Sequence, residues 1–379
     1  MTRTPRLLLA CFAALGVAMA ASAQAQDQSP APPSQRLTIK VGTLAPNGTP
    51  WYDVIQEIDA KWKKASGGQV CLTIFGGGIQ GDESDIVRKM RNGQLQMGVL
   101  TTSGLQTITK EMTALNIPLL FENYDELDYV RGKLNGRLEK ALADKGFVVL
   151  NWGEAGWVKY FAKEPIPTLR ALQQLQMFVW AGDSDAEEMY KAAGFKTVSL
   201  PVTELLMNLQ RNKIQAFPAP AAVALANQWF GPAKNMMDIR FAAIVGATII
   251  TKAAWDKVDP ALRPTLATIA QETGTRYIPR IRAIETEAIA AMVKRGLQVQ
   301  TLTPEARREW RHTVEKFYPK IRGKLVPADL FDEVNRLVLE YRAQQRAKPA
   351  AAPEPAKNPE PAKRPPRCSS PERTIPPCP

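Results

Sequence analysis

The fold is indicated first by residues 37–51, which read LTIKVGTLAPNGTPW. Residues 37–41 alternate between apolar and polar side chains, and this alternation predicts a β-strand. A loop containing glycine and proline follows, and a helix begins at about Thr49. The apolar side chains of this helix recur at helical spacing, at Trp51, Val54, Ile55, Ile58 and Trp62. The stretch therefore predicts a strand–loop–helix unit of an α/β protein.

The same alternation continues along the chain. We expect further strands at residues 70–75, 97–100, 147–151, 177–180, 197–200 and 214–217, with helical segments between most of them. Such alternation is typical of α/β lobes with largely parallel sheets, which bind ligands at the carboxyl ends of their strands. From Pro260 to Lys294 the pattern predicts one long helix, kinked at Pro279. A helix of this length could lie across two lobes, and 379 residues exceed what one ordinary core needs.

The composition argues against most common catalytic chemistries. The net charge is +12, but no run of five or six like charges occurs, so no nucleic-acid-binding arm is expected. His312 is the only histidine, which excludes a multi-histidine metal site. The four cysteines, at positions 11, 71, 368 and 378, lack the Cys-x-x-Cys spacing of zinc and iron–sulfur sites. We therefore expect a protein that is not an enzyme and has neither a cofactor nor a metal.

Both ends of the chain differ from the α/β pattern. Residues 1–25 resemble an export signal, with two arginines, an apolar segment at 7–20 and a small-residue cleavage pattern ending at Ala25. The apolar segment is short for a membrane anchor, so we expect cleavage and release into the periplasm. Residues 343–379 contain eleven prolines and are net basic, which predicts a disordered tail. The role of this tail, and whether Cys368 and Cys378 pair, stay open.

Five short motifs carry a resemblance to a known family. They are VGTLAPNGTPW (41–51), FGGGIQGDE (75–83), GQLQMGV (93–99), IPLLF (117–121) and LPVTEL (200–205). Their order and spacing resemble the solute-binding proteins of tripartite ATP-independent periplasmic (TRAP) transporters, the DctP-like family, over about residues 37–340. The resemblance implies a two-lobed periplasmic binding protein fold with an interlobe cleft and a long lobe-crossing helix. It also implies a protein that closes on a solute and catalyses no reaction.

The resemblance also suggests lobe boundaries. Lobe one is expected to hold residues 33–153 and 245–284, and lobe two residues 154–244 and 285–340. The chain would then cross between the lobes more than once.

Three positions depart from the family pattern, because apolar side chains replace polar ligand-binding residues. Phe178 stands where the resemblance places an arginine, Val158 replaces a second arginine, and Ala219 replaces an asparagine. Lys159, directly beside Val158, is the obvious substitute cation. Without a cation, a carboxylate that enters a closed apolar cleft loses several kcal/mol of hydration. Burial of a Phe-sized apolar group instead contributes about 1.5–3 kcal/mol.

These departures predict a cleft for a largely apolar or amphipathic small molecule, lipid-like molecules included, that is delivered to an integral-membrane transporter. The residues expected to line it are Leu44, Asp82 and Thr101 from lobe one, and Val158, Phe178, Trp180, Val202, Phe217 and Ala219 from lobe two. Asp82 would repel an acid and could hold a hydroxyl group instead. The opposing interpretation is that the aromatic side chains fill the cleft themselves.

Two other functions stay open. The protein could bind an organic acid, the ordinary role in the family, through Lys159 or another cation. It could also be a ligand-sensing or envelope scaffold protein whose basic tail docks a partner. The sequence names neither the ligand nor the transporter, and it leaves the oligomeric state undefined.

Overall fold

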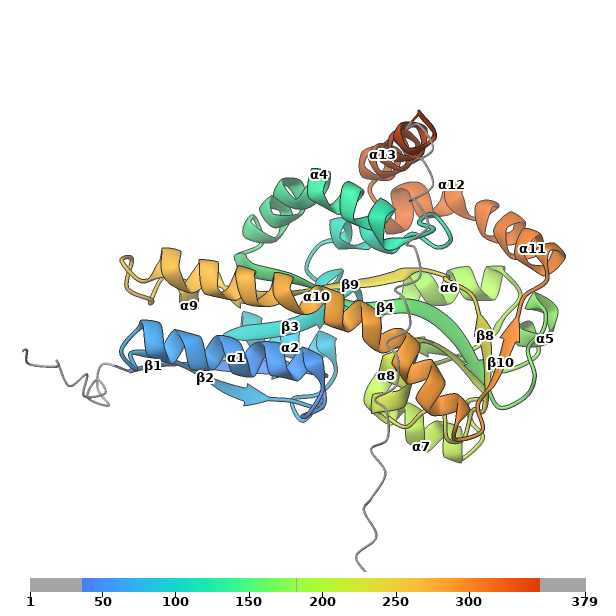
Figure 1. Cartoon of the computed structure of the whole chain (residues 1–379), viewed down its shortest axis with the longest axis horizontal. Helices are drawn as coiled ribbons and strands as arrows, with labels where there is room; N and C mark the ends of the chain where they lie inside the picture. The colour runs from blue at the N-terminus through green and yellow to red at the C-terminus, as the bar shows by residue number, and fades with distance from the viewer. Residues whose placement is uncertain (1–35, 182, 348–379) are drawn as a thin grey trace, which may run out of the picture.

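The computed structural model describes residues 36–181 and 183–347. The predicted export signal lies outside the described residues, as do Cys368, Cys378 and the chain beyond Ala347. Strands and helices alternate and build two sheets that share one long strand, with a long helix across both (Figure 1). No helix within these ranges is long and apolar enough to cross a membrane.

The sheet of lobe one has the strand order β2-β1-β3-β9-β4. Its strands are β1 (Leu37–Thr43), β2 (Val70–Phe75), β3 (Met97–Thr101), β9 (Ala243–Thr251) and the first part of β4 (Phe147–Ala162). β1 is parallel to β2 and β3, whereas β9 runs antiparallel to β3 and β4. The helices around this sheet include α1 (Pro50–Ala65), α2 (Glu83–Arg91), α3 (Thr102–Leu105), α4 (Tyr124–Ala143), α9 (Lys252–Trp255) and the 3-10 helix η2 (Lys110–Asn116). Apart from Trp51, the apolar stripe of α1 that the sequence predicts is buried against β1 and β2.

Lobe two continues from the second part of β4. It contains β5 (Gln176–Trp180), β6 (Lys196–Leu200), β7 (Ala216–Pro220), β8 (Asn235–Asp238) and β10 (Gln298–Thr301). β7 and β8 pair antiparallel with β4, and β5 is parallel to β6 and β7. Its helices are α5 (Leu169–Gln173), α6 (Ser184–Ala192), η3 (Val202–Glu204), α7 (Leu205–Gln210), α8 (Ala221–Ala226) and α11 (Pro304–Glu315).

β4 is the strand that joins the two sheets. Residues 147–157 pair with β9, and residues 158–162 pair with β7 and β8. Two register shifts interrupt the pairing with β9, and the second lies between Glu154 and Gly156. Gly156 has a φ of +109°, a conformation that other residues rarely adopt. Because such irregularities bend a strand, the chain changes direction where it passes from one sheet to the other.

Helix α10 (Arg263–Val293) is the long helix that the sequence predicts between residues 260 and 294. It crosses both lobes (Figure 1). Near its start, Leu266 and Ala270 are buried with the core of α1 and β1, and near its end Met292 is buried in lobe two. The predicted long lobe-crossing helix is thus present.

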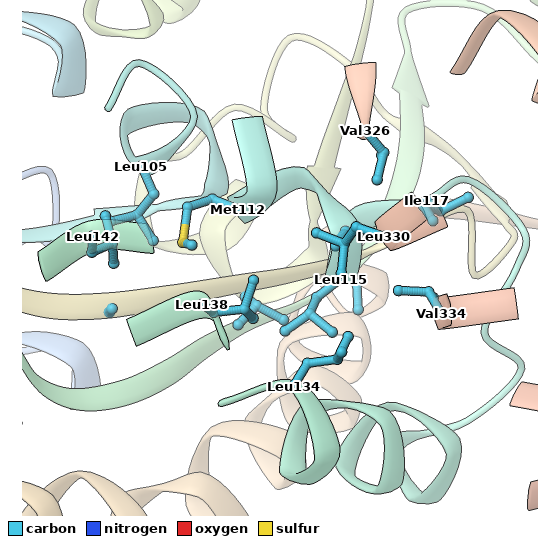
Figure 2. Close-up of a cluster of buried hydrophobic side chains, with 14 of the residues drawn as sticks. Leu105, Met112, Leu115, Ile117, Leu134, Leu138, Leu142, Val326, Leu330 and Val334 are labelled. Atoms are coloured by element: carbon cyan, nitrogen blue, oxygen red, sulfur yellow. The ribbon is translucent and has the colours of Figure 1, made fainter. Parts of the chain in front are cut away.

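The C-terminal helix departs from the predicted boundaries. After α12 (Tyr318–Lys320) and η4 (Ile321–Leu325), helix α13 (Ala328–Ala347) packs on α4 and η2, not on lobe two as the range 285–340 predicted. Figure 2 shows apolar side chains of α4, η2 and α13 meeting in one cluster. The apolar face of the amphipathic helix α13 packs into this cluster. The helix also continues five residues past 342, so the chain at 343–347 is helical and not part of a disordered tail.

Candidate ligand-binding cleft

A cavity of about 550 Å³ lies between the two lobes. Its walls come from β1, β3 and α3 on one side, from β5, β7 and η3 on the other, and from the bent part of β4. Small-molecule sites commonly have about 300–1,000 Å³. The aromatic side chains of the cleft therefore leave space for a ligand and do not fill the cleft themselves.

Most residues predicted for the site lie on this cavity. Its lining includes Leu44, Thr101, Val158, Phe178, Trp180, Val202 and Ala219. Phe178 and Trp180 are two apart on β5 and so point to the same face, where their ring centroids lie 6.5 Å apart. β4 and β7 are neighbours, which brings Val158 and Ala219 to the same wall. The three apolar replacements thus contribute to one surface.

Phe217 and Asp82 differ from the expectation, because neither is part of the described cavity lining. Phe217 is fully buried in lobe two, where it stacks on Phe161 with 5.2 Å between ring centroids. Its neighbours along β7, Pro218 and Ala219, reach the cavity in its place.

Four aromatic residues of the lining were not predicted from the sequence: Trp51, Trp152, Tyr190 and Phe241. The helical spacing groups Trp51 with the other apolar side chains of α1, but Trp51 lies in the first turn of the helix and its indole Nε1 donates to the Glu154 carbonyl at 2.8 Å. Its place directly after the loop that follows β1 was the available signal. Tyr190 and Phe241 carry no comparable local signal.

The charged residues of the lining are all acidic. They are Glu83, Glu154 and Asp183, and no described lining residue is Lys, Arg or His. Glu154 pairs with Arg282 at 2.6 Å and with Arg131 at 3.1 Å. Asp183 caps α6 and accepts a hydrogen bond from Gln106 Nε2 at 2.8 Å. Both carboxylates therefore already have partners within the protein.

Glu83 is the buried acid of this wall. Its carboxylate accepts hydrogen bonds from Thr101 N, Thr101 Oγ1 and Gly104 N at 2.9, 2.8 and 2.7 Å. Burial nevertheless raises the pKa of Glu83 to about 7, because desolvation outweighs these hydrogen bonds. A residue that exchanges a proton near neutral pH thus lies beside the cavity.

Lys159 does not reach the cavity. It alternates with Val158 along β4, so its side chain points to the opposite side of the strand. There its Nζ lies 2.8 Å from Asp238 Oδ1 and 3.3 Å from Glu285 Oε1, and the side chain is only 3% exposed. The substitute cation suggested by the sequence is therefore bound to two carboxylates away from the lining.

Asp82 connects the lobes instead of lining the cavity. Its Oδ1 accepts from Glu83 N at 2.7 Å and caps α2. Its Oδ2 accepts from Trp180 Nε1 at 2.7 Å and from Val202 N at 2.9 Å, both in lobe two. These contacts span the rim of the cleft.

Solved structures of other proteins share this two-lobed α/β fold. The family model for bacterial extracellular solute-binding proteins, family 7 (DctP), matches residues 41–324. The chain belongs to this family. Members of the DctP family are binding proteins of TRAP transporters, not enzymes, and they deliver small molecules to membrane transporters.

Individual relatives of this DctP-family protein are distant. The C4-dicarboxylate-binding periplasmic protein DctP of Vibrio cholerae is 21% identical, over 70% of this chain and 80% of its own length. The sugar acid binding protein DctPAm of Advenella mimigardefordensis, solved with galactonate, has a TM-score of 0.76 and 16% identity, covering 81% of this chain and 99% of its own.

A third relative, the TRAP periplasmic solute-binding protein of Xanthobacter autotrophicus solved with β-D-galacturonate, has a TM-score of 0.74 and 19% identity. It covers 79% of this chain and 99% of its own. The predicted family and the two-lobed α/β fold are therefore confirmed. The ligands named for the three relatives are all carboxylic acids.

Proposed function

We propose that this DctP-family protein binds a largely apolar or amphipathic small molecule in the periplasm and delivers it to its membrane transporter. The observation that carries this proposal is the charge of the cavity lining. Apart from the three acids, the described lining consists of apolar, aromatic and uncharged polar residues. Such a surface favours apolar groups and leaves a carboxylate without a counter-ion.

Cations that lie around the cleft are held in ion pairs with acidic side chains of the protein. Lys159 is held by Asp238 and Glu285 behind β4. Arg282 pairs with Asp128 and Glu154. Lys159 and Glu154 are the buried members of these pairs, and leaving either without its partner is unfavourable, so the cations would not turn to an incoming acid without a loss of stability.

An organic acid is the second candidate ligand. It is favoured by the ligands named for the relatives, which are C4-dicarboxylate, galactonate and galacturonate. In this chain it would lie against Phe178 and Val158 and near the carboxylates of the wall.

The first experiment identifies a co-purified ligand. The mature protein is purified without refolding, and its organic extract is analysed by mass spectrometry. We expect an apolar or amphipathic compound. A sugar acid or dicarboxylate would instead support the second candidate.

The second experiment compares ligands that differ only in the head group. Decanol and decanoate are added separately in calorimetric titrations, with succinate and galactonate as the reference acids. We expect decanol to bind more tightly than decanoate, and the two reference acids to give no heat of binding. Tighter binding of any of the acids would contradict the proposed ligand class.

A further inference from the structure

The carboxylate of Asp82 accepts N–H groups from the first turn of α2 and two more from the opposite lobe. Asp82 is only 4% exposed, whereas its lobe-two partners Trp180 and Val202 both line the cavity. A buried carboxylate with several charge-assisted hydrogen bonds is held firmly in place. Asp82 is thus a fixed negative charge at the junction of the lobes.

The donors that Asp82 occupies form an anion site on the wall of lobe two. Trp180 Nε1 and Val202 N converge on one oxygen, at 2.7 and 2.9 Å. Such a pair of N–H groups suits a carboxylate oxygen. In this structure the place is taken by Asp82, a carboxylate of the chain itself. An incoming acid would have to displace it and would then lie close to the charge of Asp82.

Other contacts join the two lobes near Asp82. The loop before Asp82 lies against η3, and a Cβ atom at Gly78, where φ is +77°, would be 3.0 Å from Thr203 Cγ2. Farther along the rim, Gln106 of lobe one donates to Asp183 of lobe two. Asp82 is therefore part of a continuous contact between the lobes.

We propose that Asp82 determines the selectivity of the cleft against carboxylates. Its carboxylate fills the lobe-two donors from within, so the lobes close without an anionic ligand, and an acid meets occupied donors and a like charge. The selectivity rests on the proposed function, since it concerns the head group of the ligand. The contact between the lobes is independent of the ligand.

Two variants separate this role from the capping of α2. Asp82→Ser keeps a good N-cap residue, but a single hydroxyl cannot both cap α2 and reach across to lobe two. Trp180→Phe removes one donor and keeps an aromatic ring on the wall. Asn123→Ser is the matched control, because Asn123 caps α4 through Glu126 N and makes no hydrogen bond to the described residues of lobe two.

The first readout is the shape of the unliganded protein in small-angle X-ray scattering. We expect a larger radius of gyration for Asp82→Ser and for Trp180→Phe than for the wild type, and no change for Asn123→Ser. Scattering of Asp82→Ser that is identical to the wild type would overturn the proposed contact, whatever the ligand is.

The second readout is the ratio of the dissociation constants for decanoate and decanol. We expect this ratio to fall about tenfold in Asp82→Ser, the scale of one charge-assisted hydrogen bond, and to stay constant in Asn123→Ser. An unchanged ratio would overturn the selectivity role alone. A wild-type protein that prefers decanoate would overturn the ligand class as well. If the wild type binds neither compound, the ligand class fails, and scattering still decides whether Asp82 holds the lobes.

Discussion

The two sides of β4 at the lobe junction carry opposite chemistry. On one side, Val158 faces a cavity whose described lining contains no cation. On the other side, Lys159 lies in a second hollow of about 540 Å³, which it shares with Arg240, Arg307, Arg308 and Arg311, and with Glu122, Asp238 and Glu285. Basic residues are thus present in this region, but they lie on the opposite side of β4 from the cavity. The side of the strand, and not the local composition, decides whether a cation can serve the ligand.

The largest expected effect comes from breaking the ion-pair network behind the cleft. Arg282 of α10 joins Asp128 and Glu154, whose side chain is 1% exposed. Arg282→Met should lower the free energy of unfolding by about 3–4 kcal/mol, because it removes the main partner of a buried carboxylate. Urea unfolding measures this. Arg280→Met is the control, since solvent screens the exposed Arg280–Glu287 pair and its loss should change stability little. Equal losses of unfolding free energy in Arg282→Met and Arg280→Met would contradict the expected difference between the two ion pairs.

The acidic side of the cleft can be tested through the pH dependence of stability that Glu83 causes. The pKa of Glu83 is about 7 in the folded protein, above its ordinary value, so the folded chain keeps this proton longer than the unfolded chain. Glu83 should therefore reduce stability by about 3 kcal/mol as the pH rises from about 4.5 to about 7, with no further change above. Urea unfolding of the wild type and of Glu83→Gln at several pH values tests this. In Glu83→Gln the free energy of unfolding should not show this decrease between pH 4.5 and about 7. Parallel pH profiles of the wild type and the variant would contradict the role of Glu83.

Placing a cation in the cavity wall tests directly whether the absence of a cation there sets the ligand class. Phe178→Arg should weaken binding of decanol about a hundredfold, because a charge would be left unpaired in a closed apolar wall. It should also bring measurable affinity for succinate. Calorimetry checks both, with Phe178→Leu as the variant that keeps the wall apolar. If decanol bound Phe178→Arg as tightly as the wild type, Phe178 would not contact the ligand.

Removing the cation behind β4 should have the smallest effect on binding. Lys159→Met should change affinity for decanol less than twofold, because the lysine points away from the cavity. A loss of stability is expected, since Asp238 and Glu285 lose their shared partner. If the variant lost affinity for an acid that the wild type binds, Lys159 would serve the ligand after all.

Much of the fold could be predicted from local patterns. The unit of β1 and α1 and the long helix α10 follow from alternation and helical spacing. The length of β4 could not be predicted, because residues 152–157 include two glycines and lose the alternation that marks a strand. The packing of α13 on α4 could not be predicted either, since an amphipathic helix reveals that it is covered but not by what.

The site was predicted one position at a time. The predictions failed where the contacts or the direction of a side chain depend on residues far away in the chain. Phe178 and Val158 could be placed from the resemblance, and both line the cavity. Asp82 could be assigned to the site from the resemblance, but its hydrogen bonds to Trp180 and Val202 join residues about 100 positions apart and leave no local pattern. The direction of Lys159 depends on the register shift at Gly156, which the sequence does not reveal.

The alternation along β4 also bears on how such proteins can change cargo during evolution. Val158 touches the cavity, while Lys159 belongs to an ion-pair network that ties β4 to α10. Under the proposed function, a substitution at Val158 alters the ligand that is bound, whereas one at Lys159 alters the attachment of β4 to α10. Because adjacent codons govern these separate tasks, a lineage can exchange its ligand by single substitutions on one side of a strand while the ion pairs on the other side stay unchanged.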